Sequence, residues 1–139
     1  AAVCVEHDLW CISDEVYDRL VFPPAVHVPM CTRPGMRERT LTLHSTGKTF
    51  SLTGWKVGYV VGPPVLTAAL RAVHQFNTFA TATPLQHALL EGFARGAAYE
   101  HDLVQEYLAR RDHLKGRTLS WRGTGTCVTW MMSRSAAGW

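Results

Sequence analysis

Five residues in the first half of the sequence carry groups that take part in catalysis or ligand binding, and they fall in two segments. The first segment contains Asp14 and Tyr17, and the second contains Ser45, Lys48 and Lys56. A lysine amine forms a covalent bond with a carbonyl group, a carboxylate pairs with a protonated ring nitrogen, and hydroxyl or ammonium groups hold a phosphate. Together these are the groups that an anionic pyridine cofactor requires.

Each of these residues also has a purely structural interpretation. Lys48 lies between Gly47 and Thr49 in a run of small and hydroxylated residues, where an exposed loop lysine is ordinary because lysine is rarely buried. Asp14 would only cap the turn that follows it. Tyr17 would be a core aromatic residue with its hydroxyl group in water. The residue types alone leave both interpretations open.

The expected strands place these groups at strand ends and in a loop. Residues Leu9–Ser13 form a short apolar run, which is typical of a buried strand in a parallel sheet. Asp14 follows at the carboxyl end of this strand, where open α/β sheets bind their ligands. The segments Arg39–His44 and Lys56–Val61 predict a second and a third strand. Lys48 therefore lies in the loop between the second and third strands.

Helices are expected to dominate the next part of the chain. Pro64 suits the first turn of a helix, because its missing N–H has no partner there in any case. Thr83 and Pro84 predict the N-cap and the first residue of a second helix. A third helix is expected over about Ala97–Leu114, with its apolar residues near one face. The connection Phe22–Arg39 is rich in proline and is expected to be irregular.

The segment Ser45–Tyr59, with the sequence STGKTFSLTGWKVGY, resembles the cofactor-lysine segment of class I and II aminotransferases of fold type I. Ser13–Tyr17, with the sequence SDEVY, resembles a strand-end motif of the same family, and Thr83–Gln86 also fits its pattern. Lys56 stands where many relatives carry arginine, which is similar to the branch of kynurenine, glutamine and methionine aminotransferases. The resemblance extends over about Leu9–Leu114.

The resemblance implies an α/β fold in which this chain supplies part of the large cofactor-binding domain, a mostly parallel sheet with flanking helices. The implied cofactor is pyridoxal 5'-phosphate. Lys48 is the implied catalytic residue, which forms a Schiff base with the cofactor and moves a proton at the substrate Cα. Asp14 would pair with the pyridine nitrogen, Tyr17 would donate to the ring oxygen, and Ser45 and Lys56 would bind the phosphate. The implied reaction transfers an amino group between an aromatic or sulfur-containing amino acid and a 2-oxo acid.

Parts of the family pattern are missing from this sequence. No glycine-containing phosphate loop, ring-stacking aromatic residue or Asn-Pro-x-x-Pro-Thr-Gly segment precedes the first strand. After Lys115 no clear counterpart of the carboxylate-binding arginine follows, and Arg122 and Arg134 match by residue type alone. We therefore expect residues 1–115 to form a partial aminotransferase large domain and leave residues 116–139 as an unassigned tail. A cysteine-conjugate β-lyase and a catalytically silent fragment are the alternative functions.

Composition limits the other classes of function. The net charge of +3 is small and scattered, which argues against a nucleic-acid partner. The four cysteines form no C-x-x-C pair, so a zinc site is disfavoured and reduced thiols in the cytoplasm are the simpler interpretation. The longest charge-free stretch is too short to span a membrane. By resemblance, the complete enzyme is a homodimer, and Phe79 is a candidate for lining a substrate pocket.

Overall fold

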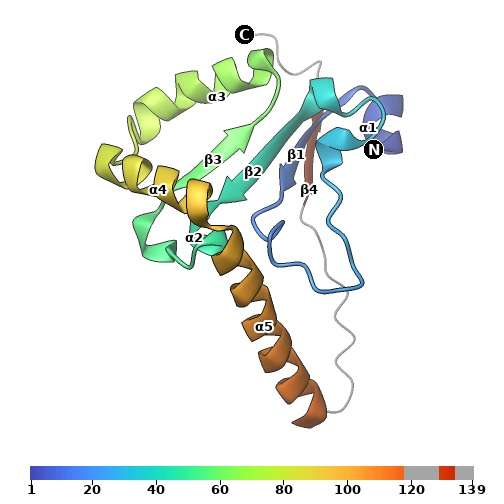
Figure 1. Ribbon diagram of the computed structural model, residues 1–139. Helices are drawn as coiled ribbons and strands as arrows, with labels where there is room; N and C mark the ends of the chain where they lie inside the picture. The colour runs from blue at the N-terminus through green and yellow to red at the C-terminus, as the bar shows by residue number, and fades with distance from the viewer. Residues whose placement is uncertain (118–128, 134–139) are drawn as a thin grey trace.

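The computed structural model describes residues 1–117 and 129–133, and it confirms the α/β class (Figure 1). The described strands form one sheet in the order β3-β2-β1-β4. Strands β1 and β2 are parallel, whereas β3 pairs with β2 and β4 pairs with β1 in antiparallel directions, so the described part of the sheet is mixed and not mostly parallel as expected. The strands are β1 (Leu9–Asp14), β2 (Thr40–Ser45), β3 (Gly58–Val61) and β4 (Thr129–Ser133).

The register of the parallel pair explains why β1 and β2 form the centre of the sheet. Cys11 pairs with Thr40 and Ser13 pairs with Thr42, so the four side chains lie on the same face. All four residues are at most 1% exposed. Because the strands are parallel, their carboxyl ends lie at the same edge of the sheet, and both segments that carry the candidate site residues begin there.

A small core covers this buried face near the amino end of β1. Cys4, Cys11 and Met36 are almost fully buried there, with Leu9 and Met30 packed against them. Burial, together with the neighbouring Cys4, raises the pKa of the Cys11 thiol to about 11, so Cys11 acts as a small apolar residue. The short helices that supply this layer are α1 (Ala2–Glu6), η1 (Met30–Thr32) and η2 (Arg37–Arg39).

The helices that follow β2 in the chain are α2 (Thr46–Thr49), η3 (Thr53–Trp55), α3 (Pro64–Asn77), α4 (Thr83–Arg95) and α5 (Ala97–Arg117). Helices α3, α4 and α5 follow the predicted positions closely, whereas α2 and η3 form where a loop was expected. Pro64 is the first residue of its helix, as expected. The predicted N-cap at Thr83 is wrong by one residue, because Ala82 is the N-cap and Pro84 becomes the second residue of its helix. Proline is tolerated there because the first four N–H groups of a helix have no partner within it.

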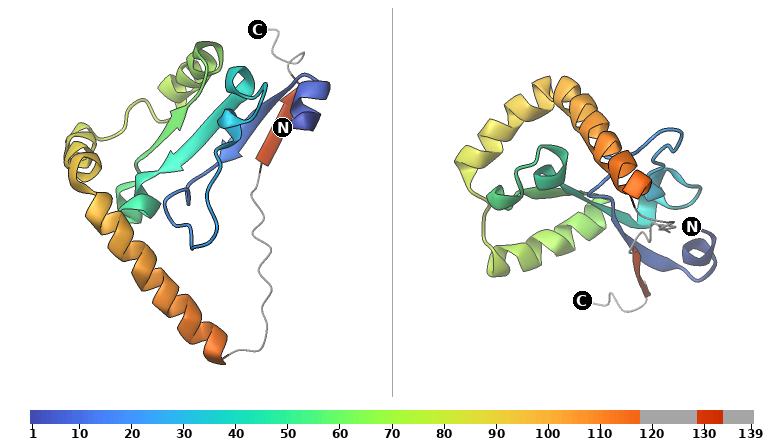
Figure 2. Two further views of the ribbon diagram at one scale, coloured as in Figure 1. Left: turned by 45° about the vertical axis from the view of Figure 1, so that its right-hand side comes forward. Right: turned by 90° about the horizontal axis from the view of Figure 1, so that it is seen from below.

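Helices α3 and α4 flank the sheet on opposite sides, and α5 projects away from it (Figure 2). The predicted apolar face of α5 is buried at Leu103, which is 7% exposed, but not at Leu114, which is 61% exposed. Apolar residues of α3 are also open to solvent: Val73 is 66% and Phe76 is 88% exposed. In the part of the chain that the structure describes, no helix is long and apolar enough to cross a membrane.

Candidate active site

The loop that carries Lys48 is closed by two hydrogen bonds from threonine side chains. Thr46 Oγ1 donates to the carbonyl oxygen of Val57 at 2.6 Å. Thr53 Oγ1 donates to the carbonyl oxygen of Gly47 at 3.0 Å. Thr46 is only 1% exposed, so its hydrogen bond is shielded from water. Lys48 therefore sits on a short helix whose first two residues, Thr46 and Gly47, are tied to the rest of the loop, rather than on an open loop.

A hollow of about 290 Å³ lies against this loop, and all three predicted residues of the second segment line it. Among the lining residues, Ser45 carries a hydroxyl group, and Lys48 and Lys56 each carry an ammonium group. Two cations and a hydroxyl donor favour an anionic group such as a phosphate. The lining residues are His44, Ser45, Gly47, Lys48, Thr53, Lys56, Val57 and Gly58.

Tyr17 reaches the same edge of the sheet from the other segment. The Nζ atom of Lys48 lies 5.9 Å from the centre of the Tyr17 ring. Tyr17 is 58% exposed, so its interpretation as a core aromatic residue is wrong. The structure thus brings Lys48 and Tyr17 together although they are 31 positions apart in the sequence.

Asp14 ends β1 and is exposed at the carboxyl edge of the sheet. Its Oδ1 atom accepts a hydrogen bond from the N–H of Val16 at 3.3 Å, so the capping contact is present. This contact uses one acceptor position of Oδ1. A carboxylate has two oxygens and about four acceptor positions, so the capping contact by itself does not exclude pairing with a protonated ring nitrogen.

Lys56 was predicted to begin the third strand, but the structure places it in the turn before that strand. Its φ angle is +56°, in the left-handed region, and it follows directly after η3. Strand β3 starts only at Gly58. The left-handed conformation costs energy for a residue with a side chain, so the loop must fix the position of Lys56. Thr53 and Gly54, which precede Lys56, fall inside η3.

Gly47 packs closely against the backbone of Thr53 within the same loop, which gives a testable prediction. A Cβ atom on Gly47 would lie 2.8 Å from the Cα of Thr53, whereas one on Gly54 would meet nothing within 4 Å. We expect Gly47→Ala to lower the free energy of unfolding by about 1–3 kcal/mol, because the backbone must shift. Gly54→Ala is the matched control in the same loop. Urea unfolding measures both, and equal effects of the two variants would contradict the tight fit.

Glu15 belongs to the strand-end motif, in which the resemblance implies no role for it, and it is the most enclosed acidic group of the site region. It is 4% exposed, although charged residues are seldom buried without partners. The side chains of Ser13 and His27 and the N–H of Met30 contact its carboxylate at 2.8–2.9 Å. The burial of Glu15 could not be read from the sequence, because its partners lie up to 15 positions away.

The buried carboxylate of Glu15 predicts an acid-sensitive contribution to stability. Burial alone would raise its pKa, but the hydrogen bonds from Met30, His27 and Ser13 outweigh burial and hold the pKa below its ordinary value of 4.5. The stabilisation is therefore fully present above pH 4.5 and is lost as the pH falls through the lowered pKa. We expect Glu15→Gln to flatten the loss of unfolding free energy that wild type shows below about pH 5. Urea unfolding at several pH values measures this, and parallel pH curves for both proteins would contradict it.

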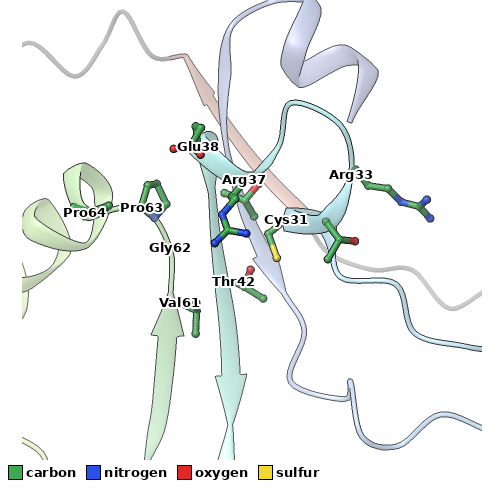
Figure 3. Close-up of a pocket in the computed structure, with 11 residues that line it drawn as sticks. Cys31, Arg33, Arg37, Glu38, Thr42, Val61, Gly62, Pro63 and Pro64 are labelled. Atoms are coloured by element: carbon green, nitrogen blue, oxygen red, sulfur yellow. The ribbon is translucent and has the colours of Figure 1, made fainter.

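A larger hollow, of about 670 Å³, lies at the opposite end of β2 and shares no lining residue with the Lys48 hollow. Figure 3 shows Arg37 and Thr42 facing into it, with Val61, Gly62 and the two prolines on the other side. The larger volume of this hollow therefore does not identify it as the active site. Within residues 1–117 and 129–133, no three His, Cys, Asp or Glu residues are grouped as metal ligands.

The described residues fit an anionic pyridine cofactor. A basic hollow with a hydroxyl donor, a carboxylate at the strand end and a lysine amine beside a tyrosine ring lie at one edge of the sheet. Gly47 has no side chain, and a Cβ atom at this position would collide with the backbone of Thr53. The other residues considered by type, Arg122 and Arg134, lie outside the described residues.

Comparison with known proteins identifies relatives of this chain. The family model for aminotransferase class I and II matches residues 1–129. Kynurenine–oxoglutarate transaminase 3 of Mus musculus is 54% identical over 93 residues, which cover 67% of this chain and 20% of the relative. Methionine aminotransferase of Escherichia coli (strain K12) is 40% identical over 108 residues, which cover 78% of this chain and 28% of the relative.

Solved structures agree with these sequence matches. N-succinyldiaminopimelate aminotransferase from Mycobacterium tuberculosis matches with a TM-score of 0.81 and 39% identity, over 84% of this chain and 30% of that structure. The chain therefore spans between 20% and 30% of the length of these three proteins.

Proposed function

Because this chain belongs to the class I and II aminotransferases, whose cofactor is pyridoxal 5'-phosphate, we propose that the complete protein transfers an amino group from an amino acid to a 2-oxo acid. One observation supports this most strongly. Lys48 and Tyr17, from separate segments, lie together at the carboxyl edge of the sheet, with 5.9 Å between the Nζ atom and the ring centre. Lys48 also lines the basic hollow that fits a phosphate.

Each site residue has a task that follows from its chemistry. When bound, the cofactor supplies an electron-withdrawing ring that stabilises negative charge on the substrate Cα. Lys48 Nζ would hold the cofactor covalently and, once the substrate amine has displaced it, would serve as the base that moves the proton at the substrate Cα. Asp14 pairs with the protonated ring nitrogen, and Tyr17 donates a hydrogen bond to the ring oxygen.

Ser45 and Lys56 have the task of holding the phosphate. The hydroxyl group of Ser45 donates a hydrogen bond, and the ammonium group of Lys56 neutralises charge. Both residues line the same hollow as Lys48. Lys56 has a left-handed backbone, and the carbonyl oxygen of Val57 directly after it accepts a hydrogen bond from Thr46, so the chain returns to the lysine helix at this point.

Aromatic or sulfur-containing amino acids are the proposed substrates, with a 2-oxo acid as acceptor. The names of the relatives, kynurenine–oxoglutarate transaminase and methionine aminotransferase, support this choice. The chain is tested with the cofactor, kynurenine or methionine, and 2-oxoglutarate, and the new 2-oxo acid is measured by chromatography. Release of ammonia and pyruvate from a cysteine conjugate would favour a β-lyase instead. Covalent cofactor at Lys48 without any turnover would identify a catalytically silent fragment.

The domain assignment, the partner and the location are also proposals. Residues 1–115 form part of the large domain, and the pairing of β4 with β1 supports extending that domain to Ser133. A second copy of the protein packs on the exposed apolar residues near Phe76 and Phe79, which are 88% and 78% exposed. Light scattering tests for the homodimer. Free thiols at Cys4, Cys11 and Cys31 support a cytoplasmic location.

A further inference from the structure

We propose that Glu15 is a positioning residue, which holds the strand-end turn so that Tyr17 lies beside Lys48 and Asp14 stays at the carboxyl edge of the sheet. This inference rests on the proposed function, because it assigns Glu15 a role toward the same site. Glu15 lies between the two residues in sequence, directly after Asp14 and two positions before Tyr17. Its own side chain turns away into the protein, where it is 2% exposed.

The backbone of Glu15 joins the turn to the sheet. Its N–H donates to the carbonyl oxygen of Leu43 at 3.0 Å, which extends the pairing of β1 with β2 past Asp14. Its carbonyl oxygen accepts from the N–H of Asp18 at 3.0 Å, which closes the turn around Tyr17. The peptide groups on both sides of the Glu15 side chain therefore determine where Asp14 and Tyr17 point.

The side chain of Glu15 holds the same turn from the interior of the protein. Oε1 accepts from the hydroxyl of Ser13 and from the N–H of Met30, each at 2.9 Å. Oε2 lies 2.8 Å from Nε2 of His27. Ser13 belongs to β1, whereas His27 and Met30 belong to the connection that returns toward β2, so one carboxylate ties the turn to two other segments. Hydrogen bonds to a buried charged group are stronger than those between neutral groups.

Tyr17 depends on this turn because little else holds it. It is 58% exposed, so packing against the core does not fix its ring. The turn is closed by two backbone hydrogen bonds, from Asp18 to Glu15 and from Leu20 to Tyr17. Lys48, in contrast, is held by the bonds of Thr46 and Thr53 within its own loop. A change at Glu15 is therefore expected to move Tyr17 and Asp14 without displacing Lys48.

The test compares Glu15→Ala, Glu15→Gln and Glu6→Ala in the full chain; Glu6 is an exposed glutamate of α1 and serves as the matched control. Amide hydrogen exchange is measured first, without cofactor. We expect the amides of the turn and of Met30 to exchange about tenfold faster in Glu15→Ala and less so in Glu15→Gln, which keeps an oxygen acceptor. Amides of α3 should be unchanged, as should all amides in Glu6→Ala.

The second readout is the pH midpoint of the visible absorbance of the cofactor-loaded chain. When Tyr17 donates to the ring oxygen, it favours the deprotonated form of the nitrogen bonded to Lys48. Loss of this hydrogen bond is expected to raise the midpoint by about one pH unit in Glu15→Ala. A residue with a merely structural role would lower occupancy and leave the midpoint unchanged. Glu15→Gln should shift the midpoint in the same direction by a smaller amount. This variant replaces Glu15→Ala in the test if Glu15→Ala does not fold.

The outcomes separate this inference from the proposed function. Faster exchange in the turn together with a raised midpoint supports the positioning role. Unchanged exchange in the turn overturns it, and so does faster exchange with an unchanged midpoint, because Glu15 would then only stabilise the fold. If wild type forms no covalent bond at Lys48, the proposed function fails for this chain. The exchange measurement still decides in that case whether Glu15 holds the turn.

Discussion

Replacing Lys48 by alanine is expected to abolish the covalent bond between this chain and pyridoxal 5'-phosphate. The reason is the position of the amine, which lines the basic hollow and lies 5.9 Å from the centre of the Tyr17 ring. In the complete protein, the same change should slow proton transfer at the substrate Cα by about two to four orders of magnitude, as for a lost general base. Exchange of the Cα hydrogen with solvent deuterium, followed by NMR, measures this step.

Lys115→Ala is the matched control for Lys48→Ala. Lys115 is an exposed lysine near the end of α5, the helix that projects away from the sheet (Figure 1). The control variant should keep wild-type visible absorbance with the cofactor, whereas Lys48→Ala should lose it. If Lys48→Ala retained that absorbance, another lysine would hold the cofactor and the assignment of Lys48 would be wrong.

Replacing Asp14 by asparagine is expected to have the second-largest effect. Asparagine keeps an oxygen that accepts the hydrogen bond from the N–H of Val16, so the turn should persist. The negative charge is lost, however, and the ring nitrogen of the cofactor is no longer held in its protonated form. We expect Cα proton exchange to slow by about two to three orders of magnitude, as when a single electrostatic contact to a developing charge is removed.

The control for this charge effect is Asp102→Asn, at an exposed aspartate of α5. Both variants lose one negative charge, so they differ only in where the charge lies. Covalent labelling of Lys48 should persist in Asp14→Asn, because the lysine loop has its own hydrogen bonds. Equal exchange rates in Asp14→Asn and Asp102→Asn would show that Asp14 does not face the cofactor.

Much of the fold follows from local sequence patterns. The apolar run Leu9–Ser13 and the segment Arg39–His44 were sufficient to predict β1 and β2. Pro64 set the start of α3, because its conformation suits a first helical turn. The lysine loop was placed correctly between β2 and β3, and Asp14 was placed correctly at the end of β1.

Features that depend on distant partners could not be predicted. The contact of Tyr17 with Lys48 arises only when β1 and β2 pair in parallel, and the burial of Glu15 arises only when His27 and Met30 return to it. The left-handed backbone of Lys56 has no sequence signal, since residues with φ above zero are usually glycine or asparagine. Strand β4 lies in a segment without a clear period, and it is defined by its pairing with β1.

The central claim is that Lys48 is the cofactor lysine, and peptide mapping tests it most directly. The wild-type chain is incubated with pyridoxal 5'-phosphate, reduced with borohydride, digested, and analysed by mass spectrometry to find the modified lysine. Lys48 lies in the hollow together with Lys56, so the map must distinguish these two side chains. We predict that the modification falls on Lys48. Modification of Lys56 or another lysine instead, or of none in folded protein, would contradict the account.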